Sequence, residues 1–133
     1  MQPYLKLFAL SLLSVSSLPH LATAKTCSMP YHSDPLVDDA PGITTSVNLC
    51  GSNSTILFAP NITYNLLTPL SFTNLTGVHF RFEGNISLSQ NVTVVQSVVN
   101  NTRIYAGRWI TIKGKDVIFE GSENSYGGWF LGQ

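Results

Sequence analysis

The sequence predicts an all-β fold preceded by one short helix, and two patterns on either side of Gly51 predict it. Before Gly51, apolar residues recur three or four positions apart, which is the spacing of one helix face. After Gly51, apolar residues form short alternating or continuous runs that end at Gly, Asn, Ser or Pro. Many short strands with no helix between them are typical of a sandwich, a barrel or a β-solenoid.

Residues 1–24 are predicted to be a secretory signal peptide. Lys6 supplies a weak basic end, LFALSLLSV (7–15) supplies a short apolar core, and ATA (22–24) places small residues at a cleavage site. A membrane anchor is the alternative, but the apolar run is too short to span a bilayer. We therefore expect a secreted, extracellular protein whose single domain is residues 25–133.

The composition argues against several classes of partner. The 133 residues include seven Lys and Arg and seven Asp and Glu, so the formal net charge is zero. This balance offers no basic surface for nucleic acid or for an anionic membrane. The chain is also 44% hydrophobic and only 11% charged, which excludes a disordered protein. We expect a monomer that needs no cofactor.

Cysteines and glycosylation sequons agree with secretion. Cys27 and Cys50 are an even pair, so one disulfide is expected in an oxidising compartment. Six Asn-x-Ser/Thr sequons indicate a glycosylated surface. The alternative is that a β-protein rich in Asn, Thr and Ser collects sequons by chance. The six sequons begin at Asn53, Asn61, Asn74, Asn85, Asn91 and Asn100.

A loop and then a helix are expected at the start of the domain. Residues 25–36 contain two prolines and show no period, which predicts a loop. The helix is predicted from Asp39 onward, with about three turns and one apolar face. That face consists of Ala40, Ile43, Val47 and Cys50.

Asp38 and Asp39 stand side by side at the predicted helix start. A glycosidase uses two carboxyl groups that face each other roughly 5–10 Å apart across a sugar. Adjacent residues at a helix start point in different directions, so this pair does not fit that chemistry. We predict instead that one of them is the N-cap of the helix. Pro41 in the first turn and Gly51 after the last periodic residue fit the same helix.

Seven segments after Gly51 are predicted to be strands. The last two flank a glycine turn, so they form either a hairpin, as in a sandwich, or stacked parallel strands, as in a solenoid. The seven segments are 55–59, 62–72 with a break at Pro69, 77–84, 85–89, 91–99, 108–114 and 116–122.

The other acidic residues and the histidines give no catalytic or metal-binding pattern. Asp116, Glu120 and Glu123 are expected to be exposed turn charges, with the rim of a substrate groove as the alternative. His32 and His79 lack the spacing of metal ligands. His79 also alternates with apolar residues in its segment, so we expect it on a solvated face.

Aromatic and basic residues near the end of the chain are a candidate sugar contact. Aromatic rings suit the apolar faces of pyranoses, and Lys or Arg binds the carboxylate of an acidic sugar. Packing within a β-protein is the alternative. The residues are Tyr105, Trp109, Tyr126, Trp129 and Phe130, with Arg103, Arg108, Lys113 and Lys115 nearby.

The order of several segments resembles the N-terminal part of fungal glycoside hydrolase family 28, the polygalacturonases and their relatives. The segments are DDAPGITTSVNLCG, then TILF with TYNL, then ITIKGKDVIFEGS and GGWF. The resemblance implies the first turns of a right-handed parallel β-helix. A short N-terminal helix would cap its open end, and the disulfide would hold that helix. It also implies hydrolysis of galacturonosyl linkages in pectin with inversion, and pectic polysaccharide as the partner.

The catalytic motifs of that family are absent from this chain. Asn101-Thr102 is followed by Arg103 and not Asp, Arg103-Ile104 is followed by Tyr105 and not Lys, and Gly-His-Gly does not occur. No catalytic residue is therefore assigned, and we expect an N-terminal fragment that is itself inactive. The alternative is a small secreted, glycosylated β-protein that binds wall polysaccharide or is structural.

Overall fold

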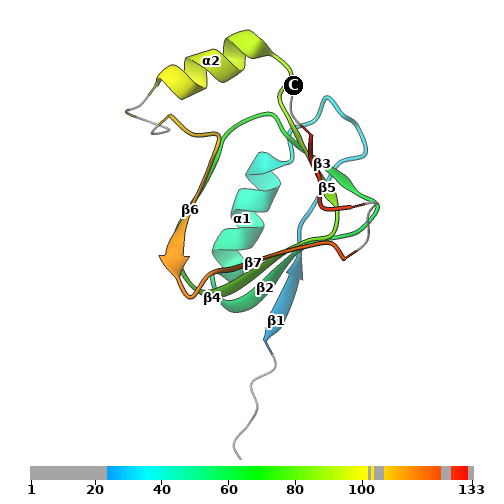
Figure 1. The fold of residues 1–133 in the computed structure, drawn as a ribbon, viewed down its shortest axis with the longest axis vertical. Helices are drawn as coiled ribbons and strands as arrows, with labels where there is room; N and C mark the ends of the chain where they lie inside the picture. Colours follow the sequence, from blue (N-terminus) through cyan, green and yellow to red (C-terminus); the bar gives the residue numbers. More distant parts are fainter. Residues whose placement is uncertain (1–23, 102, 104–106, 124–126, 132–133) are drawn as a thin grey trace, which may run out of the picture.

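The computed structural model describes residues 24–101, 103, 107–123 and 127–131, and over these residues the chain forms two helices and eight strands (Figure 1). Nearly all of the expected signal peptide therefore lies outside the described residues. No helix within the described part is long and apolar enough to cross a membrane. The elements are β1 (Lys25–Ser28), α1 (Ala40–Cys50), β2 (Ser52–Phe58), β3 (Thr63–Leu66), β4 (Leu70–Phe82), β5 (Asn85–Leu88), α2 (Val92–Asn100), β6 (Ile110–Lys115), β7 (Ile118–Gly121) and β8 (Phe130–Leu131).

The strands form two sheets, and every pairing among the described strands is parallel. The first sheet has the order β1-β2-β4-β6, with β7 also paired to β4, and the second has the order β3-β5-β8. The chain visits the first sheet and then the second, and it repeats this path in the same order. The all-β prediction is confirmed to the extent that strands in parallel sheets dominate the described residues.

The pairing of β6 and β7 decides between the two arrangements left open for the last two predicted strands. Both strands pair with β4, in parallel, β6 along its first half and β7 along its second half. The two strands therefore follow one another along the same edge and do not form a hairpin. The hairpin alternative is wrong for this part of the chain.

The parallel register stacks apolar side chains directly above one another. In the first sheet, Ile56 pairs with Phe80 and Phe80 pairs with Phe119. The rings of Phe80 and Phe119 are stacked, with centroids 5.4 Å apart. In the second sheet, Tyr64 pairs with Ile86. These columns build the core, because like residues at the same level of successive turns exclude water between the two sheets.

Three residues with positive φ lie next to one another at one bend of the first sheet. Asn53, Gly77 and Asp116 have φ values of 46°, 61° and 53°, and the flanking pairings bring them to the same level of successive strands. Only Gly, Asn and Asp adopt this left-handed conformation at low cost. A Cβ added at Gly77 would lie 2.6 Å from Asn53 Oδ1, so a larger residue there would have to displace the Asn53 side chain in addition to adopting the left-handed conformation.

Helix α1 confirms the helix predicted from Asp39. Its buried residues are the four of the predicted face, and it packs against β1, β2 and β4. A β-branched residue is normally a poor helix former, but Ile43 and Val47 are both fully buried here, so packing stabilises this helix.

The prediction of a strand at 91–99 is wrong, because this segment forms helix α2. The run of valines favours a strand by propensity alone. However, both edges of β5 are already occupied, by β3 and β8. Asn91 then caps a helix instead, since its Oδ1 accepts a hydrogen bond of 3.2 Å from the amide of Val94. Helix α2 also makes the link between β5 and β6 longer than the other links after α1, so the sequence shows no repeat of fixed length.

The loop predicted at 25–36 is wrong at its start, where β1 forms. The strand has no alternating pattern and is mostly exposed, so its sequence carries no strand signal. It forms because β2 offers a parallel partner and because a disulfide fixes one of its residues.

Candidate functional site

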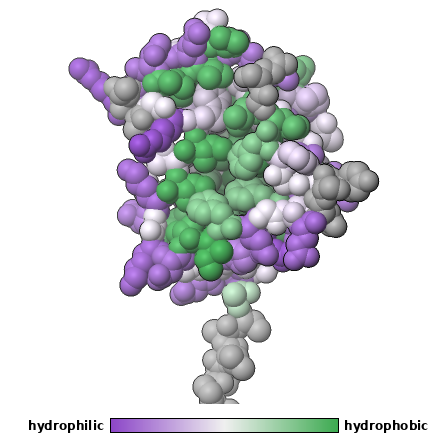
Figure 2. All heavy atoms as spheres, viewed as in Figure 1, coloured by the Kyte–Doolittle hydropathy of each residue, from purple (hydrophilic) through white to green (hydrophobic). Residues whose placement is uncertain are grey.

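A large hollow lies at the end of the stack formed by the last strands. It has a volume of about 400 Å³ and is lined mainly by phenylalanine and aliphatic side chains. Figure 2 shows these apolar side chains gathered in the centre of one face. Phe119 and Phe130 line it and are 56% and 55% exposed. Among the described residues that line it, Glu120 alone is ionisable, and its carboxylate lies 3.5 Å from Arg81 Nε, so the described part of this face offers apolar contact and no catalytic pair.

Asp39 lies fully inside the protein, where three hydrogen-bonding groups surround its carboxylate. It is 1% exposed. Oδ1 accepts a hydrogen bond of 2.7 Å from the amide of His32 and lies 2.9 Å from His32 Nδ1. Oδ2 accepts one of 2.8 Å from the amide of Asn65. Asp39 occupies the N-cap position of α1, but its side chain accepts no hydrogen bond from the helix.

Asp38 makes the contact with the helix. Its Oδ1 accepts hydrogen bonds from the amide of Ala40 at 3.1 Å and from the amide of Leu67 at 2.9 Å. Its Oδ2 accepts one of 2.5 Å from the hydroxyl of Thr68. All four oxygens of the two aspartates thus accept hydrogen bonds, and the pair joins the start of α1 to the end of β3. The two carboxylates do not face each other across an open site.

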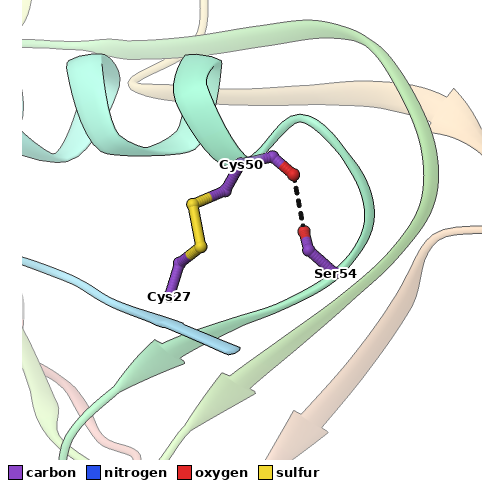
Figure 3. The surroundings of a disulfide bond; sticks show 3 residues. All are labelled: Cys27, Cys50 and Ser54. Carbon is purple, nitrogen blue, oxygen red and sulfur yellow. Dashed lines mark hydrogen bonds between the residues drawn. A yellow bond between two sulfur atoms is a disulfide. The ribbon is translucent and has the colours of Figure 1, made fainter. Parts of the chain in front are cut away.

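The cysteines form the expected disulfide, which connects β1 to the last residue of α1 (Figure 3). The Cα atoms of Cys27 and Cys50 are 6.5 Å apart. The hydroxyl of Ser54 donates a hydrogen bond of 2.8 Å to the carbonyl of Cys50, just beyond the end of the helix. The disulfide and this hydrogen bond hold the C-terminal end of α1 while the two aspartates hold its N-terminal end.

The six sequon asparagines fall into different environments. Asn53, Asn61 and Asn74 are exposed and have positive φ, so the bends of the backbone favour asparagine at these positions whether or not it is glycosylated. Asn85 is half-buried, and its Oδ1 accepts a hydrogen bond of 3.3 Å from the amide of Trp129. The other two flank helix α2, with Asn91 at its N-cap and Asn100 as its last residue.

The outer face of the first sheet carries a polar cluster. His79 Nε2 lies 2.9 Å from Glu120 Oε2, and Arg81 Nε lies 3.5 Å from the same oxygen. Arg81 also pairs with Glu83. Glu120 is therefore an ion-pair partner on a partly exposed face. Asp116 stands at a backbone bend, and Glu123 is exposed. Within the described residues, no group of three His, Cys, Asp or Glu is arranged to hold a metal ion.

The structure does not bring the candidate sugar-contact residues into one site. Trp109 lines a small pocket beside α2, whereas Phe130 lines the large apolar hollow. Tyr105 and Tyr126 lie outside the described residues. The four basic side chains, Arg103, Arg108, Lys113 and Lys115, are exposed and line neither hollow.

Two residues of the small pocket were missed by sequence reasoning. Gln90 and Gln96 line it together with Trp109. Gln96 lies in the segment 91–99, which the sequence predicts to be a strand with alternate residues on opposite sides, and Gln90 lies in the link before that segment. The signal that identifies this pocket is the helical spacing of Val92, Val95 and Gln96.

The chain is similar to proteins named probable exopolygalacturonase C from several Aspergillus species. It is 33% identical over 129 residues to that of Aspergillus niger, which covers 92% of this chain and 29% of the relative. It is 31% identical over 120 residues to that of Aspergillus fumigatus, and the match covers 88% of this chain and 27% of the relative. It is 36% identical over 92 residues to that of Aspergillus terreus, and this match covers 69% of the chain and 21% of the relative. The chain thus spans less than a third of the length of these relatives.

No protein-family model matches the chain, and no solved structure matches it. The curated relatives nevertheless confirm the resemblance drawn from its sequence.

Proposed function

We propose, since this chain is homologous to part of the exopolygalacturonases, that it belongs to a secreted pectin-degrading glycoside hydrolase. The reaction is hydrolysis of galacturonosyl linkages with inversion at the anomeric carbon, with exo-action on polygalacturonate preferred over cleavage of rhamnogalacturonan or xylogalacturonan. In an inverting reaction, one carboxylic acid protonates the leaving oxygen while a second carboxylate activates water from the opposite side. The homology over 92% of the chain is the observation that carries this proposal.

The 133 residues themselves supply neither of those carboxylates, so we propose that the chain alone is inactive. Asp38 and Asp39 are occupied in joining α1 to β3. Glu120 forms an ion pair with Arg81, and its Oε2 also lies 2.9 Å from His79 Nε2. None of these groups is free to face a second carboxyl group across a sugar, which is the arrangement that the reaction needs.

The proposed architecture is the first turns of a right-handed parallel β-helix, with α1 as the N-terminal cap. The parallel pairings and the stacked columns of like residues support it. A solenoid end exposes apolar side chains and unpaired strand edges, so it requires a cover. The apolar face of α1 supplies one, because all of its residues are buried.

Secretion and glycosylation are part of the same proposal. Residues 1–24 act as the signal peptide and residues 25–133 form the exported domain. The disulfide supports an oxidising compartment. The exposed sequons at Asn53, Asn61 and Asn74 are the acceptors best placed for glycans.

Two measurements test the proposal. The purified chain should release no more reducing sugar from polygalacturonate than a control without protein, and release above that control would contradict the proposed inactivity. The transcript beyond codon 133 should continue in frame and encode Asn-Thr-Asp and Gly-His-Gly. A stop codon there in a well-supported transcript would instead favour a small secreted protein that binds wall polysaccharide or is structural.

A further inference from the structure

A second hollow, of about 210 Å³, lies between helix α2 and the rest of the protein. One side of it is the face of α2 that carries Val92, Val95 and Gln96, three residues at helical spacing. The opposite side includes Trp109 and Leu88. No residue of α2 is buried, so the helix stands over this hollow without closing it. The space between the apolar face of α2 and the residues opposite it is therefore open to a small ligand.

One hydrogen bond holds the indole of Trp109 and a second holds its backbone, and the ring forms one wall of the hollow. Its Nε1 donates a hydrogen bond of 3.2 Å to the carbonyl of Leu66. Its own carbonyl accepts one of 2.9 Å from the amide of Leu70. The indole therefore has little freedom to turn, and a ligand that stacks on it finds the surface already oriented.

The polar side chains at the hollow are two amides and the hydroxyl of Ser89, and none of the described residues that line it is charged. Gln90 and Gln96 each offer a carbonyl oxygen and an NH₂ group, which pair equally well with the donor and acceptor sides of hydroxyl groups. The volume is below the range of about 300–1,000 Å³ that drug-sized ligands need. An aromatic wall, amide groups, no charge and a small volume together fit a single pyranose ring.

We propose that this hollow, which we call the Trp109 pocket, binds one neutral pyranose unit stacked on Trp109 and hydrogen-bonded to Gln96. An acidic sugar is disfavoured, because its carboxylate would lose water in the pocket without meeting a Lys or Arg. The pocket therefore differs in ligand class from a site for galacturonate.

The neutral sugar has two sources. One is a neutral side-chain sugar of a pectic polysaccharide, and this source rests on the proposed function. The other is the glycan of the protein itself at Asn91, whose neighbours Gln90 and Val92 both line the pocket. Asn91 Oδ1 caps α2, which leaves its Nδ2 as the atom that would carry a glycan.

Tryptophan fluorescence tests the proposal on the full chain, produced in a eukaryotic secreting host. The chain has two tryptophans, so Trp129→Phe leaves Trp109 as the single emitter. This protein is titrated separately with methyl galactoside, methyl N-acetylglucosaminide and galacturonate. We expect a saturable change in emission with a neutral sugar and affinity for galacturonate about tenfold weaker, which corresponds to about 1.4 kcal/mol.

Two substitutions on α2 separate binding from helix stability. Gln96→Leu removes the proposed hydrogen bond and should weaken neutral-sugar binding about tenfold. Ser97→Ala is the matched control, since Ser97 is on the same helix but does not line the pocket, and it should leave affinity unchanged. Circular dichroism of both variants shows whether they remain folded without relying on Trp109.

A third variant distinguishes the two sources of sugar. Thr93→Ala removes the sequon at Asn91 and keeps the Asn91 cap of α2. Equal binding of free sugar with and without this change indicates an external sugar, and binding seen only in Thr93→Ala indicates that the Asn91 glycan fills the pocket. The proposal is overturned if neither protein responds saturably, if Gln96→Leu has no effect, or if galacturonate binds as tightly as the neutral sugars. These readouts concern binding alone, so the absence of pectin hydrolysis does not affect them.

Discussion

Asp39 and Asn65, which are 26 residues apart in the chain, are joined by two hydrogen bonds that run in opposite directions. The amide of Asn65 donates to Asp39 Oδ2, and the amide of Asp39 donates to the carbonyl of Asn65, both at 2.8 Å. Each backbone amide finds an acceptor on the other residue, so the two hydrogen bonds hold the start of α1 at a fixed distance from strand β3. A buried carboxylate is tolerated here because donors surround it.

Replacing Asp39 by Asn should destabilise the protein by about 2–4 kcal/mol. Asparagine has nearly the same shape, but its NH₂ group would face a donor, either at His32 or at Asn65, and leave that donor unsatisfied. Urea unfolding measures the free energy. Asp34→Asn is the control, since Asp34 is exposed and its acceptor oxygen for the amide of Leu36 is kept. Similar losses in both variants would contradict the special role of Asp39.

Removing the disulfide should cost about 3 kcal/mol of unfolding free energy. The bond closes a loop with a sequence separation of 23, and this estimate follows from the chain entropy of such a loop. The comparison is between the oxidised protein and a variant with Cys27→Ala and Cys50→Ala, by urea unfolding. Leu49→Ala is a control on the same helix, because Leu49 is 77% exposed. A double variant as stable as the oxidised protein would show that the bond is not what fixes α1.

Stability should fall as the pH rises above about 10, and Tyr64 should account for part of the slope. Burial raises the pKa of Tyr64 above its ordinary value of 10.0, although a hydrogen bond from the amide of Ala59 acts in the opposite direction. Between the ordinary and the raised pKa, the unfolded chain has lost the proton and the folded chain keeps it, so unfolding releases a proton.

The measurement is the free energy of unfolding between pH 8 and about pH 11 for the natural chain and for Tyr64→Phe. The variant should be less stable by about 1 kcal/mol near neutrality, because the amide of Ala59 loses its acceptor. It should also show a shallower decline at high pH. Leu36→Ala is the control, since Leu36 is 84% exposed and has no titratable group. Parallel curves for the natural chain and Tyr64→Phe would refute the assignment.

The complete protein is expected to be a monomer, but the 133-residue chain alone should self-associate through its open apolar face, and Phe119→Ser should reduce that association. Phe119 is 56% exposed at an unpaired strand edge and stacks on Phe80 and Phe82. The substitution should cost about 1 kcal/mol of stability, because half of the ring is buried. Light scattering against protein concentration measures association. Leu36→Ser is the control, since Leu36 is 84% exposed and lies outside the lining of this face. A sharp, cooperative melt of a soluble monomer in the natural chain would argue against the prediction.

Glycosylation should be selective among the six sequons, with Asn85 unmodified in the folded protein. Asn85 is half-buried, and the next residue, Ile86, is 1% exposed. A glycan at Asn85 would have to displace this packed part of the second sheet. Thr76→Ala, which removes the sequon at Asn74, should lower the mass by one glycan, whereas Ser87→Ala should leave the mass unchanged. Detection of a glycopeptide at Asn85 would disprove this.

The sequence correctly predicts those helices and strands whose apolar residues repeat with a regular period within the element itself. The face of α1 was predictable because its four apolar residues repeat with a helical period and are all buried. The alternation of Val78 and Phe80 likewise predicts their burial in β4. These predictions succeed because each one depends on residues within a single element.

The failures occur where a distant partner decides the local structure. β4 continues through Asn74, whose positive φ lies in a bulge that interrupts the alternation, so the first half of the strand was not joined to the second. β1 exists because β2 pairs with it, and α2 follows β5, whose two edges are already paired with β3 and β8. Propensity of single residues contains none of this information.

For the candidate site, the sequence predicts only which chemistry the two aspartates do not perform. Sequence alone indicated that Asp38 and Asp39 are not a catalytic pair, because adjacent side chains diverge. Their actual partners, Asn65 for one and Leu67 for the other, were not predictable, since 26 and 29 residues separate donor and acceptor. The Trp109 pocket was missed for the same reason, because it forms between α2 and residues from other turns.

The insertion of α2 between β5 and β6 leaves the pairing of β4 with β6 and β7 intact, with every apolar column in place. The link between Leu88 and Ile110 therefore accommodates a helix without altering the stack. A designer who wished to display a foreign peptide on this scaffold would exchange α2 and keep both the strands and Trp109, which is hydrogen-bonded to Leu66 and Leu70. We expect lengthening of α2 to leave the core unchanged, so that new binding surfaces can arise there.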